Sequence, residues 1–301
     1  KLCGSRDLLF NFPPAMVSRL LYPLLLQWAI SDVQIPTVEI AAGVHMPVMS
    51  IGIGGLERSN ASTIVANWIK QGGRGIDTAL VYRDQSVVPE ELAKAGIDRK
   101  DVFITTKIPG CMGTKYSVEY DLKQLQTDYI DLLLIHYPSG NCSEAWSVLE
   151  DYHSKGTLRA IGISNFKKSD LESLHATAKV RPAVNQMELN VLEYDEEAMD
   201  TSKQMNITVE AYSPVGRSGH SGDIRDNKII KSVAAAHNIS TYQVALKWIL
   251  QHGNIITFQS SSAEHQAEDA DVFNFQLTED DMKALDKLHG SASLQSVPIY
   301  L

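Results

Sequence analysis

The chain has 301 residues, a formal net charge of −9 and a hydrophobic fraction of 44%, which are ordinary values for a globular protein with a sizeable core. The acidic balance argues against a nucleic-acid surface, because phosphate binding needs clustered lysine and arginine. The three cysteines (Cys3, Cys111 and Cys142) are odd in number and lack the spacing of a disulfide scaffold or a zinc site, so a reducing intracellular compartment is expected. No apolar run reaches the length of about eighteen residues that predicts a membrane-spanning helix.

Residues 1–36 form an N-terminal arm that differs in composition from the rest of the chain. Within it, residues 14–30 are rich in large apolar side chains, which would surround a helix starting near Pro14 instead of forming one stripe. Two interpretations stay open. The arm packs on the following domain or is the remnant of a targeting peptide, or it docks on a membrane surface or a partner protein. These interpretations are compatible with a protein in the cytoplasm, in an organelle after transit-peptide removal, or at the periphery of a membrane.

From residue 37 onward, short apolar runs alternate with helical stretches. Residues 37–40, a turn at 42–43 and residues 45–47 predict a β-hairpin. Helices are expected over 226–237, 241–252 and 279–289, the last two with N-caps at Ser240 or Thr241 and at Thr278. Strands are expected to begin near Met49, Arg74, Val102, Tyr129, Arg159, Ala183, Thr208 and Asn254. Buried strands joined by crossover helices predict a parallel α/β architecture.

Polar residues end three of these apolar runs: Asp77, Lys107 and His136. Tyr82 follows five residues after Asp77. In a parallel α/β barrel, the carboxyl ends of all strands open on one face, so these four side chains would converge in one pocket. Taken singly, each has an ordinary alternative as a helix cap, a solvated lysine or a core histidine.

The order and spacing of these four residues resemble those of the aldo-keto reductase family. The resemblance covers roughly residues 37–290 and continues through AIGISNF (160–166), PAVNQMELN (182–190), AYSPVG (211–216), QVALKWILQHG (243–253) and DVFNFQLTEDDM (271–282). It implies a (β/α)8 TIM barrel over residues 37–301 with an N-terminal hairpin at its floor. It also implies an oxidoreductase that reduces an aldehyde or ketone to an alcohol with a nicotinamide cofactor. An alternative function stays open, in which the fold serves as an accessory subunit of a larger, membrane-bound or soluble assembly with weak or no catalysis.

The resemblance gives each of the four residues a role. Tyr82 would be the acid that protonates the carbonyl oxygen, and Lys107 would lower its pKa from the reference value near ~10. Asp77 would hold the Lys107 ammonium in place, and His136 would orient the substrate oxygen or relay a proton.

A second set of residues would bind the cofactor. By resemblance, Ser164, Asn165 and Gln186 would hydrogen-bond the nicotinamide amide, Tyr212 would stack on its ring, and Ser213 begins the loop that follows. The ordinary alternative for these residues is hydrogen bonding within turns and strand ends. Positions 50–55 read SIGIGG, which is not a G-x-G-x-x-G motif, so the cofactor is expected across the barrel mouth.

The chain departs from the family pattern near the eighth strand, where the family holds the NADP 2′-phosphate with a lysine and an arginine. Gln259, followed by Ser260, stands at the lysine position, His265 at the arginine position, and Asp269 replaces an asparagine. A 2′-phosphate needs cationic donors, whereas an acidic residue can accept from a free ribose 2′-hydroxyl. NADP(H) is implied by the resemblance, but NAD(H) or the loss of cofactor binding stays open. No metal site is expected.

Overall fold

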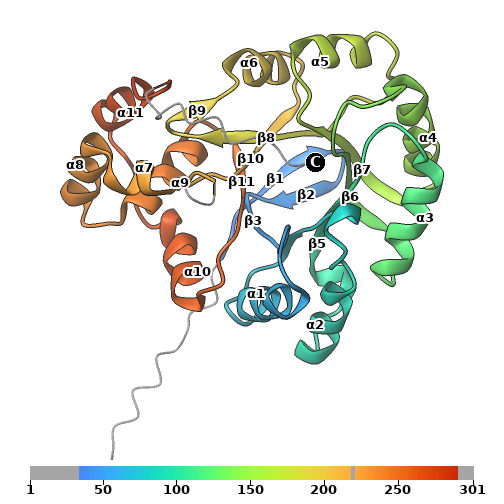
Figure 1. The fold of residues 1–301 in the computed structure, drawn as a ribbon, viewed down its shortest axis with the longest axis horizontal. Coiled ribbons are helices and arrows are strands. Elements are labelled where there is room, and N and C mark those ends of the chain that lie inside the picture. The colour runs from blue at the N-terminus through green and yellow to red at the C-terminus, as the bar shows by residue number, and fades with distance from the viewer. Residues whose placement is uncertain (1–33, 218–220, 291–301) are drawn as a thin grey trace, which may run out of the picture. The chain divides into compact units, whose positions relative to one another are not determined.

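Eight parallel strands close into a barrel in the computed structural model, which describes residues 34–217 and 221–290 (Figure 1). The strands are β3 (Met49–Gly52), β4 (Gly75–Asp77), β5 (Phe103–Ile108), β6 (Ile130–Ile135), β7 (Leu158–Ser164), β8 (Val184–Asn190), β10 (Thr208–Tyr212) and β11 (Ile255–Phe258). Each pairs with its neighbour, and the pairings of β8 with β10, β10 with β11 and β11 with β3 close the ring. The predicted (β/α)8 barrel is confirmed, and each predicted strand start is correct to within one residue.

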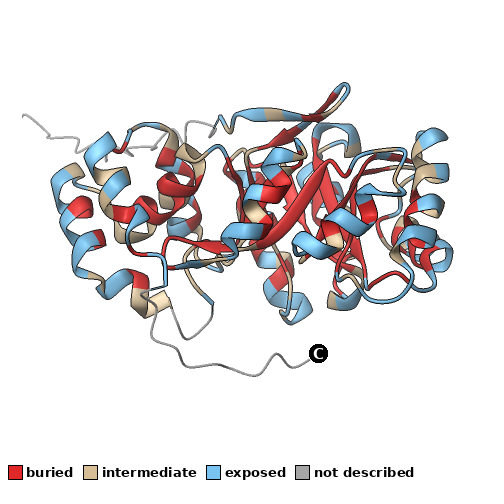
Figure 2. Cartoon of the chain, turned by 90° about the horizontal axis from the view of Figure 1, so that it is seen from above, coloured by how far each residue is buried: buried red, intermediate tan, exposed pale blue. Residues whose placement is uncertain are grey.

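Alternating side chains of each strand face the barrel interior or the surrounding helices. In β6, Leu132 and Leu134 belong to the interior cluster, whereas Leu133 and Ile135 pack with the helices. Because both faces are covered, every residue of β6 is buried, which explains why this strand is a nearly continuous apolar run. Figure 2 shows these buried strands enclosed by helices whose outer faces are exposed.

A β-hairpin closes the end of the barrel where the strands begin. Its strands, β1 (Thr37–Ala41) and β2 (Val44–Pro47), pair antiparallel, as predicted. Ile40 and Met46 of the hairpin are buried in one cluster with Phe103 and Ile255, which begin β5 and β11. Functional side chains can therefore reach solvent only at the opposite end, where the strands finish.

Helices surround the barrel (Figure 1). They are α1 (Arg58–Lys70), α2 (Val87–Ala95), α3 (Thr114–Gln124), α4 (Cys142–Ser154), α5 (Lys168–His175), α6 (Glu196–Gln204), α7 (Ser221–Asp226), α8 (Lys228–His237), α9 (Thr241–Gln251), α10 (Ala263–Ala270) and α11 (Glu279–Asp286). The predicted caps are confirmed: Ser240 and Thr278 each accept a hydrogen bond from the backbone three residues on, in capping boxes. Helix α7 was not predicted, and α11 ends earlier than predicted.

A disulfide joins Cys111, in the segment after β5, to Cys142, the first residue of α4. Nothing in the cysteine spacing predicts this bond, because the two residues meet only when β5 and β6 lie side by side. The reducing compartment inferred from that spacing stays a prediction.

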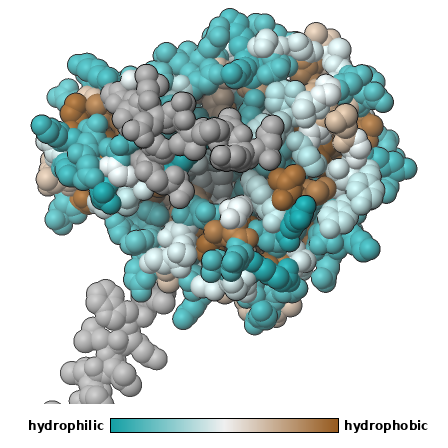
Figure 3. Space-filling view, in the orientation of Figure 1, coloured by the Kyte–Doolittle hydropathy of each residue, from teal (hydrophilic) through white to brown (hydrophobic). Residues whose placement is uncertain are grey.

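The described residues all belong to the unit spanning residues 32–301. The helix expected near Pro14 and the docking arm over residues 14–30 lie outside the described residues. On the face shown in Figure 3, hydrophobic residues form small patches among hydrophilic ones. Within residues 34–217 and 221–290, no helix is both long and apolar enough to cross a membrane.

Candidate active site

A cavity of about 1440 Å³ lies at the end of the barrel where the strands finish. Asp77 is the last residue of β4, Lys107 lies one residue before the end of β5, and His136 directly follows β6. Tyr82 ends a short 3₁₀ helix, η1 (Leu80–Tyr82), just beyond β4. Asp77, Tyr82 and His136 line the cavity, while Lys107 is fully buried behind its wall.

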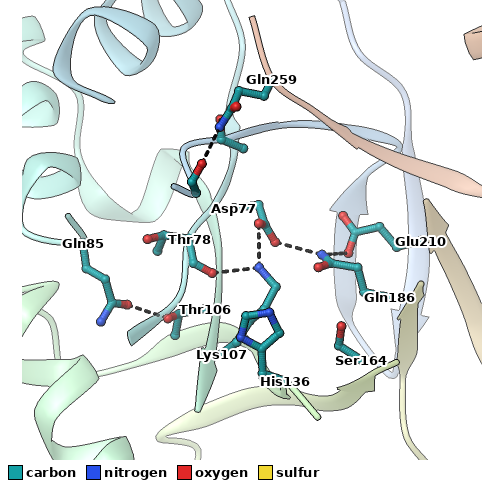
Figure 4. Close-up of polar contacts among 12 residues, drawn as sticks. Asp77, Thr78, Gln85, Thr106, Lys107, His136, Ser164, Gln186, Glu210 and Gln259 are labelled. Atoms are coloured by element: carbon teal, nitrogen blue, oxygen red, sulfur yellow. Dashed lines mark hydrogen bonds and ion pairs between the residues drawn. The ribbon is translucent and has the colours of Figure 1, made fainter. Parts of the chain in front are cut away.

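The Lys107 ammonium is held by an ion pair inside the barrel. Its Nζ donates to Asp77 Oδ1 at 2.6 Å and to the backbone oxygen of Thr78 at 2.9 Å (Figure 4). Burial by itself would lower the pKa of Lys107, but the charge of Asp77 and the hydrogen bond to its carboxylate act in the opposite direction, and the pKa of Lys107 lies above its usual value. Lys107 therefore keeps its positive charge although it is buried.

The Tyr82 ring lies beside this ammonium, with Lys107 Nζ 5.3 Å from the ring centroid. Burial raises the pKa of Tyr82, and the attraction of Lys107 only partly offsets it, so the pKa lies above its ordinary value. The effect of Lys107 has the sign predicted from the sequence, but the predicted net lowering is wrong in this structure, because burial dominates. Tyr82 consequently stays protonated, as a proton donor must.

Gly54 allows the Tyr82 ring to take this position. A Cβ added at Gly54 would lie 2.7 Å from two ring carbons of Tyr82, which is closer than real Cβ contacts. Gly54 of the SIGIGG segment thus has a steric role, in the close approach of an aromatic ring to the backbone.

His136 is flanked by two aromatic rings. Its imidazole meets the Tyr82 ring edge-on at 5.8 Å between centroids and stacks on Tyr137 at 4.7 Å. Burial, with the nearby charge of Lys107, lowers the pKa of His136 to about 3, so the imidazole is neutral at physiological pH. Its Nδ1 is buried and has no hydrogen-bond partner among the described residues.

The amide of Asn165 links three parts of the site. Its Nδ2 donates to the His136 backbone oxygen and to Ser164 Oγ, both at 3.0 Å. Its Oδ1 accepts from the Tyr212 hydroxyl at 2.8 Å. Because both amide hydrogens are used within the protein, Asn165 is better placed to orient Ser164 and Tyr212 than to donate to a ligand.

The hydrogen-bonding capacity left at the site matches a primary carboxamide. Ser164 Oγ accepts from Asn165 and still has its own hydrogen to donate. Gln186 Nε2 donates to Asp77 Oδ2 and Glu210 Oε2, both at 2.9 Å, which leaves its carbonyl oxygen as an acceptor. A nicotinamide carboxamide carries one acceptor oxygen and one NH2 group, so the residues present fit this group.

Three residues with strained backbone conformations lie next to predicted site residues. Asn165, Ser213 and Arg83 have φ values of 60°, 51° and 61°, in the left-handed region that non-glycine residues seldom occupy. Each directly follows one of the predicted site residues. Such conformations persist where the surrounding structure imposes them, and they cluster at functional sites.

The segment after β11 forms the distal end of the cavity, which is lined there by Gln259, Ser260, His265, Glu268 and Asp269. Cofactor binding by the first three stays a prediction. Gln259 Nε2 donates to the Gly54 backbone oxygen at 2.9 Å. Burial, with the charge of Glu268, raises the pKa of Asp269 to about 7. Among the described residues, no lysine or arginine of this segment lines the cavity.

Comparison with known proteins identifies the chain. A sequence model described as "Aldo/keto reductase family" matches residues 48–289. The chain belongs to the aldo/keto reductase family. The glyoxal reductase of Bacillus subtilis (strain 168) is 38% identical over 260 residues, which cover 84% of this chain and 92% of that enzyme. An aldo-keto reductase of Mycolicibacterium smegmatis is 34% identical over 271 residues, covering 88% of this chain and 94% of that protein.

Solved reductases have the same fold. An aldo-keto reductase from a Medee basin deep-sea metagenome library superposes with a TM-score of 0.81 at 30% identity, covering 86% of this chain and 97% of that one. A Bombyx mori aldo-keto reductase in complex with NADP superposes with a TM-score of 0.80 at 27% identity, covering 88% and 96%. The protein is an NAD(P)H-dependent oxidoreductase that reduces carbonyl compounds, as the sequence predicted.

Glu210, a fully buried carboxyl inside the barrel of this aldo/keto reductase, was not among the residues predicted from the sequence. A signal was available, because Glu210 lies two residues before Tyr212 and strand side chains alternate with period two. The ion pair between Arg217 and Glu188 at the cavity mouth was not predicted either; Arg217 donates to the two oxygens of Glu188 through Nε and Nη2. That pair joins segments after β10 and within β8, so it could be found only once the strand order was known.

Proposed function

We propose that this aldo/keto reductase reduces small aldehydes, including dicarbonyl compounds of the glyoxal type, and that it uses NADH at least as well as NADPH. The observation that carries the reaction is the Lys107–Asp77 ion pair buried beside the Tyr82 ring at the inner end of the cavity. The proposed substrate is supported by the rim of the cavity, and the proposed cofactor by its distal end.

The proposed mechanism gives each residue one task. A bound nicotinamide supplies the hydride to the carbonyl carbon. Tyr82 transfers its phenolic proton to the carbonyl oxygen, and the neighbouring Lys107 ammonium stabilises the negative charge that then develops on the phenol. Asp77 keeps Lys107 in place, and neutral His136 orients the carbonyl oxygen through a ring N–H.

The rim of the cavity supports a small substrate. Residues 109–113 connect β5 to α3, and residues 136–141 connect β6 to α4, so neither connection has the length to fold over the site. Val81 and Tyr137 are the large side chains left exposed beside Tyr82 and His136, at 47% and 38%. A compact aldehyde can reach Tyr82 past such a rim, and the glyoxal reductase of Bacillus subtilis is a relative with this type of substrate in its name.

The distal end of the cavity supports the use of NADH. A 2′-phosphate would lie near Glu268 and Asp269 without a lysine or arginine from the β11–α10 segment, among the residues described. The Gln259 side chain is already engaged with Gly54. A ribose 2′-hydroxyl, in contrast, can donate to a carboxylate. The same arrangement that weakens NADPH binding therefore accommodates NADH.

Titration of the purified protein with NADH and with NADPH, followed by nicotinamide fluorescence, tests the cofactor proposal. We expect dissociation constants within about threefold of each other, or tighter binding of NADH, because each lost charge-assisted bond is worth roughly 1.5–3 kcal/mol. NADPH binding tenfold tighter than NADH would overturn it.

Steady-state reduction of glyoxal, a short aliphatic aldehyde and a bulky aromatic ketone tests the substrate proposal. We expect the highest kcat/KM with glyoxal or the short aldehyde. A clear preference for the bulky ketone would contradict a small-substrate site. The Tyr82→Phe variant provides the blank for turnover that does not use this site.

A further inference from the structure

A row of hydrogen bonds crosses the barrel interior from one wall to the other. Glu210 on β10 accepts from Gln186 on β8 at 2.9 Å, and Gln186 donates to Asp77 on β4 at 2.9 Å. Asp77 in turn holds Lys107 on β5 at 2.6 Å. Figure 4 shows the Gln186 amide lying between the two carboxyl groups.

Glu210 has no evident structural need to be an acid. Its side chain is fully buried, it pairs in register with Gln186 on the neighbouring strand, and its Oε1 has no hydrogen-bond partner among the described residues. Burial of a carboxyl group is unfavourable unless it is neutral or well paired, and a nonpolar side chain of similar size would pack there at lower cost. A carboxylic acid at this position is therefore better explained by function than by packing.

Glu210, together with Asp77, fixes which way the Gln186 amide faces. The amide has two N–H groups and one oxygen, and the two N–H groups point to Glu210 and Asp77. A rotated amide would place its oxygen against the Asp77 carboxylate, which is already paired with Lys107 and can only accept. With both N–H groups committed, the oxygen is the part of Gln186 that remains for a ligand in the cavity.

We propose that Glu210 is a positioning residue for the nicotinamide cofactor, acting through Gln186. It holds the Gln186 amide so that the amide oxygen accepts from the NH2 group of the nicotinamide carboxamide. This inference rests on nicotinamide binding by the reductase, and it is independent of the choice between NADH and NADPH, because the two cofactors share that carboxamide.

Protonation does not interfere with this role. Burial, together with the charge of Asp77, raises the pKa of Glu210 to about 8, so the side chain is largely a neutral acid at pH 7. A neutral carboxyl group still accepts through its carbonyl oxygen. A glutamine at this position would accept in the same way, which provides a matched control.

Two variants separate positioning from packing. Glu210→Gln keeps the acceptor, whereas Glu210→Leu has a similar size and none. The dissociation constants of NADH and NADPH, measured by fluorescence at pH 6.5, should stay within about twofold of wild type for Glu210→Gln. For Glu210→Leu both should rise roughly three- to tenfold, the loss expected for one ordinary hydrogen bond. The KM for the carbonyl substrate should not change in either variant.

Thermal unfolding of the cofactor-free proteins provides the folding control. Glu210→Leu removes a buried ionisable group but leaves one Gln186 N–H without an acceptor, so its Tm should stay close to that of wild type, and weaker cofactor binding then cannot come from unfolding. The inference is overturned if Glu210→Leu binds cofactor as tightly as wild type, or if Glu210→Gln loses as much affinity as Glu210→Leu. A wild-type protein that binds neither cofactor would instead overturn nicotinamide-dependent reduction and this inference together.

Discussion

The ammonium nitrogen of Lys107 lies 5.3 Å from the centroid of the Tyr82 ring, within the barrel and out of contact with solvent. At this separation, the positive charge opposes the effect of burial on the Tyr82 pKa without overcoming it. The phenol is therefore a neutral acid at rest, and the Lys107 ammonium stabilises the negative charge that develops on the phenol oxygen as the proton leaves. Efficient proton transfer in such a site depends on the position of the ring as much as on its pKa.

Replacing Tyr82 by phenylalanine should remove the proton donor and leave the cavity shape intact. We expect kcat to fall by roughly 10²- to 10⁴-fold, the usual contribution of a general acid. The cofactor dissociation constant should change little, because the hydroxyl acts on the substrate oxygen. Steady-state kinetics and fluorescence titration measure the two quantities. Undiminished kcat in this variant would mean that another group protonates the oxygen.

Gly54→Ala should slow the reaction although it replaces no catalytic group. The new methyl would lie 2.7 Å from the Tyr82 ring, so the ring must move away from its place beside Lys107. We expect kcat to fall by at least about tenfold, because small misplacements of reacting groups are costly.

Gly222→Ala is the control for Gly54→Ala, since a Cβ at Gly222 comes no closer than 3.5 Å to its neighbours. Equal activity in the two alanine variants would show that the position of the Tyr82 ring does not limit turnover.

Much of the fold could be predicted from the sequence, because buried parallel strands are apolar runs whose ends are easy to locate. The same regularity placed Lys107 and His136 at one end of the barrel. Effects that depend on how deeply a side chain is buried, or on which residues lie beside it on the neighbouring strand, could not be predicted. The net direction of the Tyr82 pKa depends on how deeply the ring is buried, and the Glu210–Gln186 bond depends on β8 and β10 being adjacent.

Introducing cations at the distal end should shift cofactor use toward NADPH. The double variant Gln259→Lys with His265→Arg places two cationic donors where the family pattern has them. Each charge-assisted bond to the 2′-phosphate is worth roughly 1.5–3 kcal/mol, so NADPH affinity should rise at least about tenfold. NADH affinity should change much less, which the same fluorescence titration measures. An equal gain for both cofactors would indicate a general charge effect in place of phosphate recognition.

The disulfide should stabilise the segments that follow β5 and β6. Cys142→Ser opens a bond that closes a sequence separation of 31 residues, and loss of such a bond typically lowers the free energy of unfolding by about 2–4 kcal/mol. Chemical denaturation with and without dithiothreitol measures this difference. Wild-type protein should approach the variant when reduced, and the variant itself should not respond. A wild-type protein that is insensitive to the reductant would contradict a stabilising disulfide.

The buried carboxyl group of Asp121 should make stability depend on pH. Asp121 accepts from Gln85 at 2.7 Å, its other oxygen has no partner among the described residues, and burial raises its pKa from 3.8 to about 7. The folded state then binds more protons than the unfolded state between about pH 4 and 7, so this group destabilises the protein progressively as pH rises through that window.

Asp121→Asn removes this titration. Relative to wild type, the variant should gain stability from pH 4 to 7, by on the order of a few kcal/mol, and the gain should be constant at higher pH. Urea denaturation at pH 5 and pH 8 measures the gain, and Asp128→Asn, at an exposed position on the neighbouring turn, is the control. A difference between Asp121→Asn and wild type that is the same at pH 5 and pH 8 would mean that the Asp121 carboxyl group does not titrate in this range. The protein would then hold that carboxyl ionised inside its core, and the Gln85 bond would have to stabilise the charge.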